Sequence, residues 1–106
     1  MEDRRKADRV KVNLTVKWEG SLATLRGEIT DLSTNGCFIL SEDKVTLGEL
    51  IKVEIPYPRS GSLCIQAKVI YQMPEIGFGV CFTGAEESEM KRLRWLVKAE
   101  LYRAGE

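Results

Sequence analysis

The chain turns at Asp31-Leu32-Ser33-Thr34-Asn35-Gly36, residues 31–36, between two segments with the alternating pattern of β-strands. Asn35-Gly36 predicts a tight reversal with positive φ angles, because glycine has no Cβ and asparagine tolerates the left-handed region. Asp31 and Ser33 are two residues apart, so on an extended segment their side chains leave the same face. The sequence leaves two roles open for these side chains: they bond their own turn, or they bind a ligand.

Alternating apolar and polar residues predict six β-strands over residues 10–18, 24–32, 37–40, 49–55, 63–71 and 76–82. Six strands joined by short turns indicate an all-β fold, a six-stranded antiparallel β-barrel whose closure removes exposed strand edges. The pattern points Tyr71 inward. It also points Asp31 inward unless the strand ends or bulges there, and a buried carboxylate needs a partner.

The strand over 76–82 places Gly77, Gly79 and Cys81 on one face, opposite the apolar side chains. Such a strip lets backbone, a helix or a ligand come close, and packing is the preferred interpretation for Gly77.

The chain is expected to form a single domain over 1–106 with three parts: a flexible charged arm over 1–9, the barrel over 10–83 and a C-terminal α-helix over 84–104 packed on it. Acidic residues open the helix, where the helix dipole favours them. Its apolar stripe comprises Met90, Leu93, Leu96, Val97 and Leu101, flanked by Trp95 and Tyr102.

Composition argues against several functional classes. Sixteen basic residues balance sixteen acidic ones, so no global field attracts nucleic acid or a membrane surface. The chain has no histidine, which argues against a hydrolase or a metal site, and we expect neither catalysis nor a cofactor. Three widely spaced cysteines indicate reduced thiols in a cytoplasmic protein. The charged N-terminus is not a secretory signal, and the apolar runs are too short for membrane insertion.

The arm carries Arg5 and Arg9, four residues apart, with Arg4 directly before them. A guanidinium offers a planar fork of donors that matches phosphate oxygens or the O6/N7 edge of guanine. Asp31 can accept hydrogen bonds from guanine N1–H and N2–H. Ser33 can bond a phosphate or ribose oxygen, and Gly36 lets the backbone approach closely. These residue types together describe a site for a guanine nucleotide.

Residues 5–9, RKADR, resemble the RxxxR motif of PilZ domains, and residues 31–36, DLSTNG, resemble their (D/N)xSxxG motif. PilZ domains are bacterial receptors for the second messenger cyclic di-GMP. The resemblance implies that the arm folds over the barrel mouth and grips this ligand. The ligand-binding residues are then Arg4, Arg5, Arg9, Asp31, Ser33 and Gly36. It further implies that Arg4 favours two intercalated ligand molecules over one, and we expect the signal to pass to an unidentified protein partner.

Three other functions stay open. A ligand-independent PilZ-like adaptor would use the fold only as a protein-binding surface. A single-stranded nucleic-acid barrel would need a basic, aromatic face, which the zero net charge and two Trp, three Tyr and three Phe do not favour, so no DNA or RNA is expected. An enzyme is the weakest alternative. Cys64 and Cys81 lie on the polar side of their strands and are expected to be partly exposed, but no base accompanies them.

Overall fold

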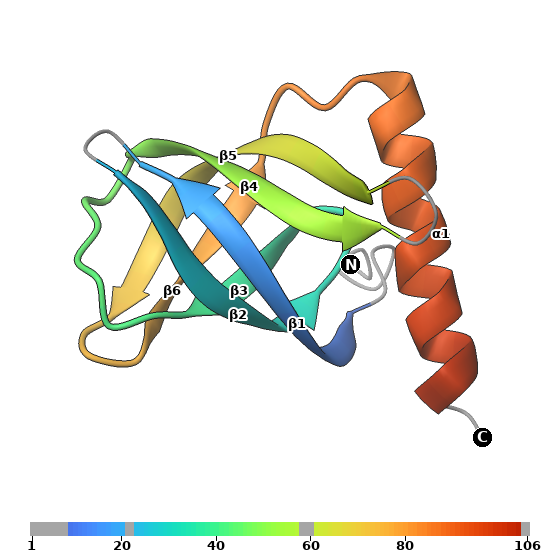
Figure 1. Ribbon diagram of the computed structural model, residues 1–106, viewed down its shortest axis with the longest axis horizontal. Helices are drawn as coiled ribbons and strands as arrows, with labels where there is room; N and C mark the ends of the chain where they lie inside the picture. Colours follow the sequence, from blue (N-terminus) through green and yellow to red (C-terminus); the bar gives the residue numbers. More distant parts are fainter. Residues whose placement is uncertain (1–8, 21–22, 58–60, 105–106) are drawn as a thin grey trace, which may run out of the picture.

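Six antiparallel strands form a closed barrel in the described part of the chain, which comprises residues 9–20, 23–57 and 61–104 of the computed structural model. One helix stands beside the barrel (Figure 1). The elements are β1 Val10–Glu19, β2 Thr24–Leu32, β3 Gly36–Leu40, β4 Leu50–Tyr57, β5 Gly61–Met73, β6 Gly77–Phe82 and α1 Glu87–Ala104. The predicted fold class, an antiparallel six-stranded barrel with a C-terminal helix, is therefore confirmed.

The barrel has the strand order β1-β2-β3-β6-β5-β4 and closes where β4 pairs with β1. β1 and β4 pair only through Lys17–Glu19 and Lys52–Glu54, so closure covers part of the edge of each of these two strands. Four strands are longer than the sequence indicated, and the largest extensions are in β4, which continues to Tyr57, and β5, which runs from Gly61 to Met73. The prediction that Ile76 begins the last strand with an inward side chain is wrong. Ile76 lies in the turn before β6 and is half exposed, because its N–H bonds the Met73 carbonyl to close that turn.

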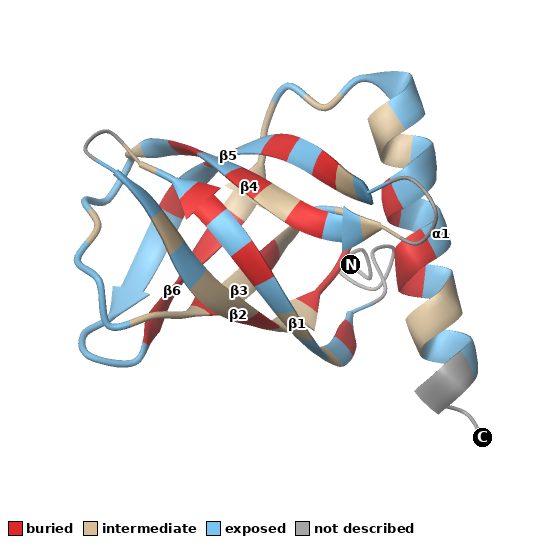
Figure 2. Cartoon of the chain, in the orientation of Figure 1, coloured by how far each residue is buried: buried red, intermediate tan, exposed pale blue. Residues whose placement is uncertain are grey.

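The core fills the barrel with one face of each strand, seen as alternating buried and exposed bands in Figure 2. Trp18 and Phe78 meet edge to face inside it, with ring centroids 5.2 Å apart and an interplanar angle of 74°. That geometry suits the quadrupoles of two aromatic rings. The side chains of β5 that were expected to point inward, as far as Val69, are buried.

A β-bulge at Thr30 changes the side on which Asp31 leaves β2. Ile29 pairs with Ile39, but Asp31 pairs with Phe38, so Thr30 is an extra residue relative to β3. An extra residue reverses the alternation beyond it. Leu32 consequently takes the buried position and Asp31 turns to the outer face. This is the bulged alternative that the sequence left open.

A second bulge, at Ile70, does the same to Tyr71. Val69 pairs with Val80, whereas Tyr71 pairs with Gly79. The prediction that Tyr71 faces inward is wrong: its side chain lies outside the barrel and is 47% exposed. Each bulge therefore brings one large polar or aromatic side chain to the outer surface.

Helix α1 packs against β1 and β5 through Leu93, Leu96 and Val97, which are buried. Its first turn is acidic, and Glu89 Oε1 accepts a hydrogen bond from the backbone N–H of Glu86 at 2.8 Å. The apolar stripe ends earlier than predicted, since Leu101 is exposed. Within the described ranges, no helix has both the length and the apolar character needed to cross a bilayer.

Candidate functional site

Ser33 uses its hydroxyl to shape the turn between β2 and β3. The N–H groups of Asn35 and Gly36 donate to Ser33 Oγ at 3.0 and 3.2 Å, and Oγ donates to the Gly36 carbonyl at 3.4 Å. The Ser33 N–H also bonds that carbonyl, at 2.9 Å. A hydroxyl has one proton and two lone pairs, so its full capacity is used inside the turn. Ser33, which is buried, thus takes the self-bonding role that the sequence left open.

Gly36 is a glycine because β3 and β6 run very close together. The predicted positive φ at Asn35-Gly36 is wrong: among the described residues, only Glu75, Gly48, Gly61 and Gly84 have positive φ. A Cβ on Gly36 would instead overlap the carbonyl oxygen of Val80 on β6. The close approach made by this glycine is to the neighbouring strand.

Among the described residues, Asp31 has a weak partner for one carboxylate oxygen and none for the other. Its Oδ2 lies 3.4 Å from Lys11 Nζ, on a lysine side chain that is 87% exposed. Such a surface pair contributes little stability. Oδ1 is buried and accepts no hydrogen bond from the described residues. A buried acceptor without a donor costs free energy, so this carboxylate keeps unmet hydrogen-bonding capacity.

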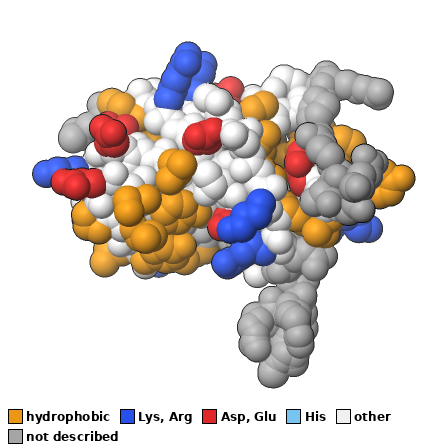
Figure 3. All heavy atoms as spheres, turned by 90° about the horizontal axis from the view of Figure 1, so that it is seen from below, with side chains coloured by type: hydrophobic (Ala, Val, Ile, Leu, Met, Phe, Trp, Pro, Cys, Tyr) orange, Lys and Arg blue, Asp and Glu red, His pale blue; other side chains and the backbone are white. Residues whose placement is uncertain are grey.

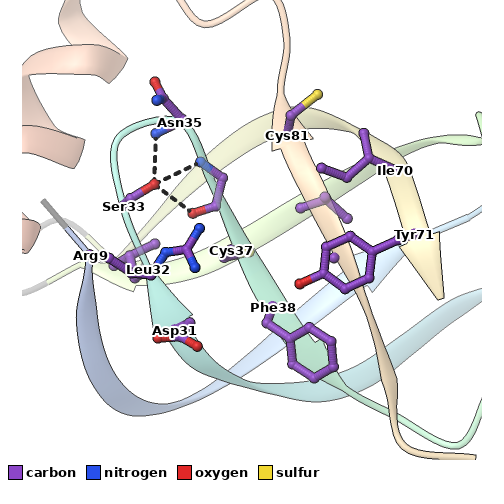
Figure 4. A pocket seen from close by; sticks show the side chains of 13 residues that line it. Arg9, Asp31, Leu32, Ser33, Asn35, Cys37, Phe38, Ile70, Tyr71 and Cys81 are labelled. Carbon is purple, nitrogen blue, oxygen red and sulfur yellow. Dashed lines mark hydrogen bonds between the residues drawn. The ribbon is translucent and has the colours of Figure 1, made fainter. Parts of the chain in front are cut away.

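Arg9 and the 31–36 motif meet in one hollow of about 140 Å³ on the outer surface of the barrel. Four of the six predicted residues line it, namely Arg9, Asp31, Ser33 and Gly36. Figure 4 shows Arg9 and Asp31 on one side of this hollow, with the Ser33 turn above them. Arg4 and Arg5 lie outside the described residues. The antiparallel pairing of Lys11 with Asp31 explains the meeting, because it places the start of β1 beside the end of β2.

Two aromatic residues that were not predicted, Phe38 and Tyr71, form the opposite wall of the hollow (Figure 4). Their rings are stacked, with centroids 6.0 Å apart and an interplanar angle of 24°. The sequence signal for them was Gly79, a strand glycine that indicates a close approach by something large. The alternation of side chains along β5 predicted that Tyr71 points into the core, and the bulge at Ile70 turns this side chain to the outer face instead.

The three cysteines are free thiols with different surroundings. Burial raises the pKa of the Cys37 thiol from 9.0 to about 12. Cys64 is exposed and Cys81 partly exposed, as the sequence predicted. Over the ranges that the structure describes, no three His, Cys, Asp or Glu side chains gather to hold a metal ion.

Comparison with known proteins identifies the family. The model of the PilZ domain matches residues 3–99. The chain belongs to the PilZ domain family. As a PilZ domain, it shares its fold with the PilZ domain of YcgR from Escherichia coli, solved with c-di-GMP. The TM-score is 0.80 at 16% identity, covering 96% of this chain and 95% of that one.

Other solved structures are similar at the same level. The PilZ domain of CeSA from a cellulose-synthesizing bacterium gives a TM-score of 0.70 at 16% identity, covering 87% of this chain and 96% of that one. The Bacillus subtilis inhibitor of motility MotI/DgrA gives 0.73 at 17% identity, covering 96% of this chain and 51% of that one. A search of curated proteins gives no match. At these identities the likeness establishes the fold alone.

Proposed function

We propose that this PilZ domain is a cytoplasmic receptor for cyclic di-GMP. The observation that supports this most directly is the convergence of Arg9 and Asp31, one from each motif, on a single hollow. Asp31 Oδ1 has no donor among the described residues, so this carboxylate keeps hydrogen-bonding capacity for a ligand N–H. The E. coli YcgR domain of the same fold was solved with c-di-GMP, which makes this dinucleotide the first ligand to test.

Each residue has a chemical task in this proposal. Guanine carries N1–H and N2–H donors on one edge, and the Asp31 carboxylate accepts from them. Arg9 holds a phosphate or the O6/N7 edge of a base with its planar fork. Arg4 and Arg5 supply further cations from the arm, and Arg4 favours binding of two intercalated ligand molecules. Ser33 and Gly36 contribute indirectly, by holding the turn and β3 in the position that shapes the hollow.

We propose that the protein signals through a change in the position of its N-terminal arm. Because the ligand brings two negative charges to the arm's arginines, binding fixes the arm over the barrel at an entropic cost of about 1–2 kcal/mol per ordered residue backbone. The change in arm position is then read by a protein partner, with no catalytic step.

Calorimetric titration of the full chain with cyclic di-GMP tests the proposal. We expect saturable binding with two ligands per chain, and a Kd about fivefold to a hundredfold weaker for Arg9→Ala, the range of one bidentate arginine–guanine contact. Asp31→Asn should weaken binding similarly, and cyclic di-AMP should bind poorly, because adenine lacks the N1–H and N2–H donors. The absence of heat from the wild-type chain would refute the proposal.

Matched controls come from the same barrel. Arg26→Ala removes an arginine from β2 that does not line the hollow, and Glu28→Gln alters a carboxylate on the same strand as Asp31. Both should bind as the wild type does. Lys11→Ala separates loss of the Lys11–Asp31 pair from loss of the carboxylate itself. It should change the Kd by less than Asp31→Asn, since the pair is exposed.

A ligand-independent adaptor remains the second candidate. It is favoured by one observation: the hydroxyl of Ser33 and the missing Cβ of Gly36 already serve the fold, so neither residue requires a ligand. Protein capture that is unchanged by saturating cyclic di-GMP and by Arg9→Ala would support it.

A further inference from the structure

The outer face of the barrel carries one continuous row of paired residues across five strands. Lys11 on β1 pairs with Asp31 on β2, and Asp31 pairs with Phe38 on β3. Phe38 pairs with Gly79 on β6, and Gly79 pairs with Tyr71 on β5. The row therefore presents, in order, a cation, a carboxylate, an aromatic ring, a bare glycine and a second aromatic ring.

Two of the three register shifts in the described part of the barrel turn Asp31 and Tyr71 outward into this row; the third lies between Lys11 and Leu14 on β1. Without the extra residue at Thr30, Asp31 would point into the barrel, and without the one at Ile70, Tyr71 would do so. Bulges commonly re-aim a side chain next to a functional site. Here both bulges act on the same row, although about forty residues separate them in the chain.

Tyr71 lies over Gly79, so its ring closes the row from the side opposite Asp31. A Cβ on Gly79 would overlap ring atoms of Tyr71, which means that the ring occupies the space left by the missing side chain. Phe38 stacks beside it at 6.0 Å. Tyr71 is nevertheless 47% exposed and lines the same hollow as Arg9 and Asp31. One side of its ring is thus supported by the barrel while much of the residue stays accessible (Figure 4).

Exposed apolar side chains continue from this wall. Ile70, Met73 and Ile76 are 50%, 44% and 49% exposed. Figure 3 shows hydrophobic side chains gathered on the lower face of the barrel, with basic and acidic side chains at their margin. Exposed apolar surface rimmed by polar groups often marks an interaction site or a ligand-binding groove.

We propose that Tyr71, supported by Phe38 and Gly79, is a stacking residue for a guanine base of the ligand. Strands in a sheet lie about 4.8 Å apart, so three spacings place the backbones of Asp31 and Tyr71 roughly 14 Å from each other. That span accommodates a purine whose edge is bound by Asp31 and whose face rests on the aromatic wall. The inference rests on the proposed function and deepens it: Asp31 selects the base by its edge, and Tyr71 holds the base by its face.

Titration of full-length Tyr71 variants with cyclic di-GMP tests this inference. Tyr71→Phe keeps the ring and should bind as the wild type does. Tyr71→Leu covers Gly79 without a π face, and Tyr71→Ala removes both. The loss of one base–aromatic stack should weaken the Kd about fivefold to a hundredfold in Tyr71→Ala, with Tyr71→Leu close to it. Tyr102→Ala, which removes an exposed tyrosine from α1, is the matched control and should have no effect.

The outcomes separate the two proposals. If Tyr71→Leu binds as well as the wild type, Tyr71 merely fills the space over Gly79 and the inference is wrong. If Tyr71→Ala binds normally while Asp31→Asn does not, the inference again fails but the proposed function stands. If the wild-type chain shows no binding, the proposed function fails and this inference fails with it. Unfolding midpoints of all variants, measured without ligand, show whether the fold is kept.

Discussion

Gly36 sets how closely β3 approaches β6, and this determines what a substitution there does. An alanine Cβ would overlap the Val80 carbonyl oxygen, which belongs to the backbone and cannot rotate away. We expect Gly36→Ala to lower the free energy of unfolding by about 3 kcal/mol or more, at or above the upper end of ordinary overpacking. Gly61→Ala is the control: its φ is +87° but the added Cβ meets no atom of the described residues within 4 Å, so only about 1 kcal/mol should be lost. Equal losses in urea unfolding would contradict this account.

Cys37 gives the fold a dependence on alkaline pH. Burial raises the pKa of its thiol from 9.0 to about 12, so between these values the unfolded chain releases a proton that the folded chain keeps. The stability from the buried thiol is therefore complete below pH 9 and declines toward about pH 12, by about 1.4 kcal/mol per pH unit.

Urea unfolding of the wild type, Cys37→Ala and Cys64→Ala across this range measures the effect. Cys37→Ala should show the shallower alkaline decline, even though its stability below pH 9 is lower. The exposed Cys64 should contribute no such difference, and parallel curves for all three proteins would contradict the assignment.

At the scale of strands and turns, the period-two pattern predicted each strand, and it failed where a bulge intervened. Alternation is a local rule, so it holds through the buried side chains of β5 as far as Val69. The extra residue at Ile70 is defined by the pairing of β5 with β6. The sequence of β5 alone carries no information about this pairing. Tyr71 was therefore assigned to the core. For Asp31 the sequence did suggest a bulge, because burying an unpaired carboxylate inside the barrel costs several kcal/mol.

The turn between β5 and β6 stores strain that a substitution can release. Glu75 has a φ of 69°, in the left-handed region that costs a side chain with Cβ about 1–2 kcal/mol. Asparagine tolerates this region better, so Glu75→Asn should stabilise the domain by about 0.5–1 kcal/mol and raise Tm by about 3–6 °C. Glu42→Asn changes a loop residue whose own φ is not positive, so it should leave Tm unchanged in the same thermal melts. A Tm for Glu75→Asn at or below that of the wild type would show that the strain is absent.

At the scale of the whole molecule, chain topology decides which part of the site could be predicted. Arg9 and Asp31 flank one antiparallel pair, β1 and β2, so these two residues line the same hollow. Tyr71 reaches the same hollow only because β6 lies between β3 and β5 in the closed barrel. That strand order is not local information, and the aromatic wall was missed for this reason.

Ligand binding should stabilise the entire domain, because a ligand held by residues from several strands binds the folded chain and not the unfolded one. At a concentration one hundred times Kd, cyclic di-GMP would add about 2.7 kcal/mol. For a domain of this size that corresponds to a rise in Tm of roughly 10 °C. At the same ligand concentration Arg9→Ala should show a smaller rise and Arg26→Ala the full one. Each variant lowers the net charge of the chain from zero by one. A difference between the two rises in Tm therefore reports the position of the arginine and not the total charge. Equal rises in the two variants would place the ligand away from the hollow.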